Sequence, residues 1–134
     1  MSRREAREAA FAFLYQLNFR NEPVSEQKEM YLQLHPLEDG DLPYFDEITN
    51  GVFEKKDELD NEYAKYLKDW KLSRLPKVDV ILLRIAVYEM LHVEDIPVSV
   101  SINEAVVLAK KYSSEESKSY INAVLGKIGN DLEK

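Results

Sequence analysis

Residues 78–91 read VDVILLRIAVYEML, and this stretch is the most apolar part of the chain. Its apolar side chains point to almost every side of a helix, and only Asp79, Arg84 and Glu89 interrupt them. A helix that is apolar all round lies in the interior of a protein, and a stretch this short cannot span a bilayer. We therefore expect residues 78–91 to form the central helix of a bundle.

Helical periodicity continues on both sides of this stretch. Apolar residues recur at three- and four-residue steps over 3–19 and more weakly over 24–35, where a His-Pro pair ends the pattern. A third stripe covers 44–70, and Gly51 followed by the polar run 54–58 predicts a kink or a break. No segment alternates as a strand does, so we expect an all-α fold, a compact bundle of six or seven helices.

Two helix starts are predicted from the spacing of serine and glutamate. Ser101 and Glu104 have the S-x-x-E spacing of a capping box, and Ser113 and Glu116 repeat it. In this device the serine hydroxyl and the glutamate side chain each satisfy a free backbone group of the first turn. The last two helices should therefore begin at these serines.

The length and composition are those of one small domain. Of the 134 residues, 45% are hydrophobic and 32% charged, which allows a core beneath a solvated surface. The absence of cysteine excludes disulfides and thiolate chemistry, and the charged N-terminus does not have the form of a signal peptide. We expect a soluble, cytoplasmic, single-domain protein, residues 1–134, with an N-terminal half of about 1–72 and a C-terminal half of about 73–134.

Charge is distributed unevenly along the chain. The formal net charge is -7, yet the first 20 residues hold four arginines and two glutamates, a net charge of +2. The acidic remainder repels nucleic acid at long range. Any binding to a polyanion must therefore be local and sensitive to salt.

Signatures of catalysis are missing from the sequence. Only two histidines occur, His35 before a proline and His92 after the central stretch, and neither has a nucleophile or a second ligand at a useful spacing. The four glycines do not form a phosphate-binding loop. We therefore expect no enzymatic activity, no metal site and no cofactor.

The first helix carries the clearest signal for binding. Steps of three and four residues place Arg4, Arg7, Phe11 and Tyr15 on one stripe, apart from the face rich in alanine and leucine. Guanidinium groups grip phosphates and neighbouring rings stack on unpaired bases, a combination suited to single-stranded RNA. Two simpler interpretations stay open: the arginines solvate the first turn, or the two rings belong to the core.

Three segments resemble the NusB family of transcription antitermination proteins, namely RREAREAAFAFLYQ (3–16), LSRLPKVDVILLRIAVYEML (72–91) and IPVSVSINEAVVLAKKYSSEESKSYINAVLGKI (96–128). The resemblance implies an all-α fold of two three-helix halves and a non-enzymatic role in processive antitermination of ribosomal RNA operons, without a cofactor. It also implies binding of boxA RNA, a heterodimer with the ribosomal protein NusE, and assembly into a transcription elongation complex, with no membrane partner.

The resemblance also implies a set of site residues. RNA would be contacted by Arg3, Arg4, Arg7, Tyr15, Glu116, Lys118 and Tyr120. The arginines would bind phosphates and the tyrosines would stack on bases. Glu116, which stands where the family has aspartate, would accept hydrogen bonds from bases or position an arginine. The candidates for the NusE-facing surface are Tyr88 and Glu89, although Arg84 as an internal partner explains the charge of Glu89 equally well.

Two other functions remain compatible with the sequence. NusB-like domains are also fused to enzymes that methylate ribosomal RNA, so the chain could be an accessory RNA-binding module of such an enzyme. Alternatively, it could be a helical adaptor that binds only protein, with its N-terminal arginines against an acidic partner. The oligomeric state is open, and a homodimer is compatible with the sequence as well.

Overall fold

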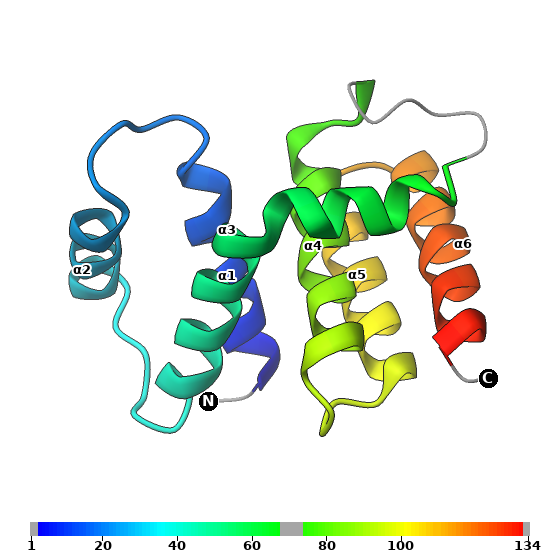
Figure 1. Ribbon diagram of the computed structural model, residues 1–134. Coiled ribbons are helices and arrows are strands. Elements are labelled where there is room, and N and C mark those ends of the chain that lie inside the picture. Colours follow the sequence, from blue (N-terminus) through cyan, green and yellow to red (C-terminus); the bar gives the residue numbers. More distant parts are fainter. Residues whose placement is uncertain (1–2, 68–73, 133–134) are drawn as a thin grey trace.

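The computed structural model describes residues 3–67 and 74–132, and within these ranges it contains six α-helices and no strand (Figure 1). The helices are α1 (Arg3–Gln16), α2 (Val24–Leu34), α3 (Leu42–Ala64), α4 (Lys77–His92), α5 (Val98–Tyr112) and α6 (Glu115–Leu132). The predicted all-α class is confirmed. The pattern over 24–35 ends where expected, with His35 at the C-terminal cap of α2, and α1 ends three residues before the predicted limit at Phe19.

Helix α4 lies at the centre of the bundle, as its composition predicted. It packs against α1 and α3 on one side and against α5 and α6 on the other (Figure 1). Its buried apolar side chains lie on almost every face and include Ile81, Leu82, Leu83, Ile85, Ala86 and Val87. Burying one large aliphatic side chain contributes about 1.5–3 kcal/mol, so α4 stabilises much of the core. Because α4 contacts helices on both sides, the division of the chain near residue 72 stays a prediction.

Helix α3 is bent near its middle. Lys55 has φ of -108° and ψ of 16°, outside the helical region, so the kink predicted for this helix is confirmed. The first part of α3 packs beside α1, and the second part crosses over α4 toward α6 (Figure 1). The stripe predicted to reach residue 70 is helical only as far as Ala64, and 68–70 lie outside the described residues.

The two predicted capping boxes do not form as expected. Helix α5 begins at Val98, directly after Pro97, because the fixed φ of proline suits the entry to a helix. Ser101 is therefore inside the helix, and it is buried. At α6 the capping residue is Ser114, one position later than predicted, and its hydroxyl oxygen accepts a hydrogen bond from the Ser117 N–H at 3.0 Å.

One continuous hydrophobic core is built from α1, α3, α4, α5 and α6. Helix α2 lies at its margin, contributes only partly buried apolar side chains, and exposes Met30 and Leu34. None of the helices in the described ranges is both long and apolar enough to cross a lipid bilayer.

Candidate nucleic-acid interface

Two of the three predicted phosphate-binding arginines lie exposed at the start of α1. The guanidinium of Arg3 lies 4.7 Å from the centre of the Tyr44 ring, which holds this cation against an aromatic face. Arg4 donates hydrogen bonds of 2.9 and 2.7 Å to the Glu104 carboxylate on α5, while 59% of its side chain remains exposed. These hydrogen bonds lower the pKa of Glu104. Both arginines can therefore still meet an anion from solution.

Arg7 is not part of this exposed cluster, which corrects its predicted role. Only 3% of the residue is exposed, and its Nε and Nη2 atoms donate to the Glu89 carboxylate at 2.8 and 3.1 Å. Glu89 is fully buried, so it does not belong to a surface for a protein partner either. Arg84, considered as the internal partner of Glu89, instead pairs with Asp60 through two contacts of 2.8 Å. Arg7 and Glu89 are tolerated in the core because each charge neutralises the other.

The pair of Arg7 and Glu89 belongs to a buried polar cluster that joins four helices. The Tyr44 hydroxyl of α3 and the Ser101 hydroxyl of α5 also donate to the Glu89 carboxylate, the latter at 2.8 Å. Burial, together with the charge of Glu89, raises the pKa of Tyr44. A contact of 3.6 Å between Arg7 and Glu104 extends the cluster to the exposed edge. The cluster thus holds the start of α1, and with it the exposed arginines, against the rest of the fold.

A row of aromatic rings follows α1 toward its C-terminal end. The ring centres of Phe11 and Tyr15 are 6.1 Å apart, and those of Tyr15 and Phe19 are 5.1 Å apart. Phe11 is in the core, as one of the open interpretations stated, whereas Tyr15 is half-buried and Phe19 is exposed. Tyr15 therefore keeps a partly accessible ring, although the stripe as a whole does not face solvent.

One ring at this surface, that of Tyr112 at the end of α5, was not predicted from the sequence. Its ring centre is 5.1 Å from that of Phe11, and 42% of the residue is exposed. The Lys111 ammonium lies 5.3 Å from this ring, and Glu8 accepts hydrogen bonds from both residues. The available signal was the run KKY at the end of a predicted helix, where lysines adjoin an aromatic residue.

The first turns of α6 place the remaining predicted RNA contacts on different sides of the helix. Glu116 is exposed, and Lys118 pairs with Glu115 at 3.3 Å on the flank that faces α5. Tyr120 is half-buried on the other flank, where its hydroxyl donates to Asp79 of α4. Burial and this hydrogen bond raise the pKa of Tyr120. These residues therefore do not converge on one point.

The structure divides the predicted contacts between two ends of the bundle. Arg3 and Arg4 lie at the N-terminal end of α1, and the first turns of α6 lie at the opposite end of the molecule (Figure 1). Helix α1 has 14 residues, and a rise of about 1.5 Å per residue separates its ends by about 20 Å. A single-stranded ligand that contacts both ends must run along α1 and past Tyr112.

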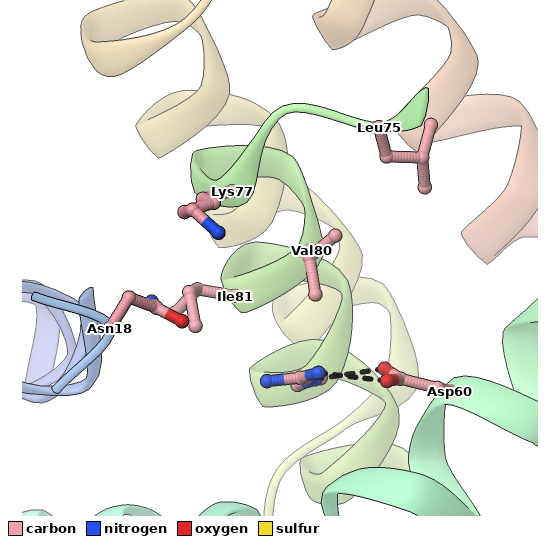
Figure 2. A pocket seen from close by; sticks show the side chains of 7 residues that line it. Asn18, Asp60, Leu75, Lys77, Val80 and Ile81 are labelled. Carbon is pink, nitrogen blue, oxygen red and sulfur yellow. Dashed lines mark hydrogen bonds and ion pairs between the residues drawn. The ribbon is translucent and has the colours of Figure 1, made fainter. Parts of the chain in front are cut away.

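A groove of about 220 Å³ lies along the first turns of α4 (Figure 2). It is lined by Asn18, Asp60, Leu75, Lys77, Val80, Ile81 and Arg84. Asn18 and Asp60 approach α4 from the end of α1 and from α3, and the ion pair between Arg84 and Asp60 forms part of the wall. The groove thus combines apolar and charged side chains on an accessible surface of the central helix.

Tyr88 was the other candidate for contact with a protein partner. It is only 8% exposed, and its ring lies against α3 at Gly51. Most of the Tyr88 side chain is therefore buried in the core and is not accessible to a partner. Together with the burial of Glu89, this corrects the predicted partner surface. An accessible surface of α4 is found instead in the groove along its first turns, about two turns earlier in the helix.

Comparisons with known proteins agree on one family. The sequence profile of the NusB family matches residues 4–130. A transcription antitermination protein NusB of Acetivibrio thermocellus is 47% identical over 128 residues, which cover 96% of this chain and 88% of that protein. A T. maritima NusB structure matches with a TM-score of 0.88 at 34% identity, over 97% and 92% of the two chains. A chain from the crystal structure of antitermination factors NusB and NusE in complex with dsRNA matches with a TM-score of 0.85 at 25% identity, over 96% of both chains.

Proposed function

This chain belongs to the NusB family, and we propose that it binds boxA-type single-stranded RNA of ribosomal RNA operons together with the ribosomal protein NusE. The family acts in transcription antitermination, and its function is binding rather than catalysis. One observation supports RNA and NusE as partners: nearly the whole chain matches a chain from a complex of NusB and NusE with dsRNA. The proposed preference for a single strand rests on the accessible aromatic rings, which can stack on unpaired bases. We infer that the protein acts in the cytoplasm, within a transcription elongation complex.

The proposed RNA surface has a cationic end and an aromatic end. Arg3 and Arg4 would bind phosphates irrespective of sequence, because guanidinium groups there recognise the backbone and not the bases. Tyr15 and Tyr120 would stack on unpaired bases, and Tyr112 supplies a third ring beside the middle of α1. Affinity would therefore arise at one end and selectivity at the other.

Two polar side chains on the first turns of α6 are the remaining proposed RNA contacts. Glu116 is exposed and repels phosphate, so its role would be to accept hydrogen bonds from base amino groups. Lys118 forms an ion pair with Glu115 at 3.3 Å, so it would contribute less to phosphate binding than an unpaired lysine. Both would adjust selectivity more than affinity.

The acidic body of the protein explains why a partner would strengthen RNA binding. With a net charge of -7, the chain attracts RNA only close to its exposed arginines. We place NusE at the groove along α4, where Lys77, Val80 and Ile81 combine charged and apolar surface. Mixed surfaces of this kind are typical of protein interfaces. A partner bound there would lie next to the C-terminal end of α1, where the aromatic row ends.

RNA titrations with and without NusE test the proposal. The probes are a single-stranded boxA RNA, a scrambled strand of the same composition, and a boxA duplex. We expect the single-stranded boxA RNA to bind most tightly, and NusE to increase its affinity. Equal binding of the boxA and scrambled strands would contradict sequence-selective recognition. A preference for the duplex would contradict the single-stranded mode.

The position of NusE is tested by two variants with the same change of charge. Lys77→Glu alters the α4 groove, and Lys127→Glu alters an exposed position on α6 outside it. We expect only Lys77→Glu to weaken NusE binding when RNA is absent, because only that side chain would lie at the interface. Equal effects of the two variants would place NusE elsewhere.

Titrations with the same RNAs and with NusE also distinguish the other functions that are compatible with the sequence. A protein-only adaptor would bind its partner without salt-dependent RNA binding. An accessory module of an RNA methyltransferase would bind ribosomal RNA without preferring boxA. Sedimentation of the free chain measures whether a homodimer forms, and a dimer that dissociates as RNA binds would place RNA at the dimer interface.

A further inference from the structure

A buried carboxylate lies beneath the start of α6. Asp79, in the first turn of α4, is fully buried. Its Oδ1 atom accepts a hydrogen bond from the Ser113 hydroxyl at 2.7 Å. Its Oδ2 atom accepts bonds from the hydroxyls of Ser117, at 2.6 Å, and Tyr120. Across residues 3–67 and 74–132, no lysine, arginine or histidine forms an ion pair with this carboxylate.

Burial removes water from the Asp79 carboxylate, and the hydroxyl groups that replace the water are held in fixed directions. A buried charge destabilises a fold unless strong hydrogen bonds replace its water, and an apolar side chain would join α4 to α6 with less desolvation. Hydrogen bonds to a carboxylate are directional, whereas apolar contacts leave a neighbouring ring free to turn. The carboxylate at position 79 therefore fixes the orientation of the groups that donate to it.

Tyr120 is the donor whose orientation matters at the surface. Ser113 and Ser117 are short, and Ser117 is buried, whereas Tyr120 is half-buried and its larger side chain packs at the margin of the core. The backbone beneath that ring is also held, because Ser114 caps α6 through the Ser117 N–H. With the backbone and the phenol oxygen both anchored, the direction of the ring's long axis, from Cβ to the hydroxyl, is set.

We propose that Asp79 is a positioning residue, which fixes the Tyr120 ring in the orientation in which that ring stacks on RNA. This inference rests on the proposed RNA-binding function and adds to it a residue that does not itself touch RNA. The same turn of α4 carries Lys77 and Val80 in the partner groove. One helical turn thus borders the proposed partner site and holds the proposed RNA-stacking ring.

The variant Asp79→Asn tests this role in the free protein. The amide keeps the size of the side chain but has no charge and one acceptor oxygen instead of two, so it holds the three hydroxyls of Ser113, Ser117 and Tyr120 more weakly than the carboxylate does. NMR of protein with labelled tyrosine rings should show one ordered Tyr120 ring in the wild type and a shifted, mobile ring in the variant. Unchanged Tyr120 resonances in Asp79→Asn would overturn the proposal.

Two further variants make this measurement specific. Tyr120→Phe keeps the ring and removes the hydrogen bond, so it should reproduce the ring mobility even where Asp79→Asn folds poorly. Tyr66→Phe removes a similar bond, from Tyr66 to Asp131 near the other end of α6, and should leave the Tyr120 ring unchanged. A Tyr120→Phe ring as ordered as that of the wild-type tyrosine would also contradict the proposal.

RNA titration then connects the ring to binding. Asp79→Asn should weaken boxA binding about fivefold, within the coupling range for residues in contact, and should have no further effect in a Tyr120→Ala background. An equal loss in both backgrounds would show that Asp79 acts through the general fold and not through the ring. A wild-type chain that binds boxA and scrambled RNA equally would contradict the proposed function instead, and the NMR measurement would still decide the role of Asp79.

Discussion

Arg7 on α1 and Glu89 on α4 are 82 positions apart in the sequence, yet they form a buried ion pair with contacts of 2.8 and 3.1 Å. The sequence patterns assigned one residue to an RNA surface and the other to a protein surface. The structure joins them inside the molecule, where Tyr44 and Ser101 complete the hydrogen bonding of the carboxylate. The pair therefore anchors the helix that carries the exposed arginines.

Arg7→Ala should reduce the free energy of unfolding by about 3–5 kcal/mol, because it leaves the Glu89 charge buried without a cation. Arg3→Ala, at an exposed position of the same helix, should change stability little. Urea unfolding followed by circular dichroism measures both variants. Similar stabilities for the two would show that the buried pair does not anchor α1.

Replacing Arg3 and Arg4 together by glutamine should weaken the binding of boxA and scrambled RNA alike. The slope of log affinity against log salt should become shallower by up to about 0.7 for each phosphate of a single strand that the variant no longer neutralises. Arg20→Gln, which removes an exposed arginine paired with Glu22 beyond the end of α1, should leave the slope unchanged. If the double variant has the same slope as the wild type, then Arg3 and Arg4 do not bind phosphates.

Gly51→Ala should destabilise the protein by about 1–3 kcal/mol, the range for overpacking a core. A methyl group on Gly51 would lie 2.3 Å from Cζ of the Tyr88 ring, so that buried ring would have to move. Gly126→Ala is the matched control inside α6, where a methyl group meets nothing within 4 Å. It should stabilise the protein by up to about 1 kcal/mol, because alanine favours a helix. Thermal unfolding that shows the same sign for both changes would contradict this packing.

Acid should weaken the contact between α1 and α5. The hydrogen bond from Arg4 holds the pKa of Glu104 below its usual value of 4.5. A carboxyl group with a lowered folded-state pKa stabilises the fold above its unfolded-state pKa, and this contribution is lost as pH falls through the folded value. Stability should therefore decline below about pH 4.5, and Glu104→Gln should reduce the decline. Thermal unfolding profiles from pH 7 to pH 3 that run parallel for the two proteins would exclude this contribution.

Helix positions were predictable because they depend on local patterns. The apolar run over 78–91 lies within α4, and the weak stripe near Gly51 anticipated the kink at Lys55. Capping was less predictable, since Pro97 and Ser114 compete with neighbouring serines to begin a helix, and small differences in free energy decide between them.

The aromatic and cationic candidates were predictable as residue types but not as a surface. Periodicity places Phe11 and Tyr15 on one stripe of α1, yet it does not say how far the neighbouring helices cover that stripe. Contact with Tyr112 of α5 helps bury Phe11 and leaves Tyr15 at the margin. Tyr112 itself received no role from the sequence, because its exposure depends on how α5 ends beside α1.

Local periodicity and ordered motifs were enough to predict most of the helices, the central place of α4 and the family. Which polar groups are buried, and which partners they meet, depends on how the helices pack against one another. Arg7 meets Glu89, and Asp79 meets the hydroxyls of α6, across long separations in the chain. A charge enters the core only where distant groups satisfy it, and that condition is set by the packing of the helices and not by any stretch of residues read alone.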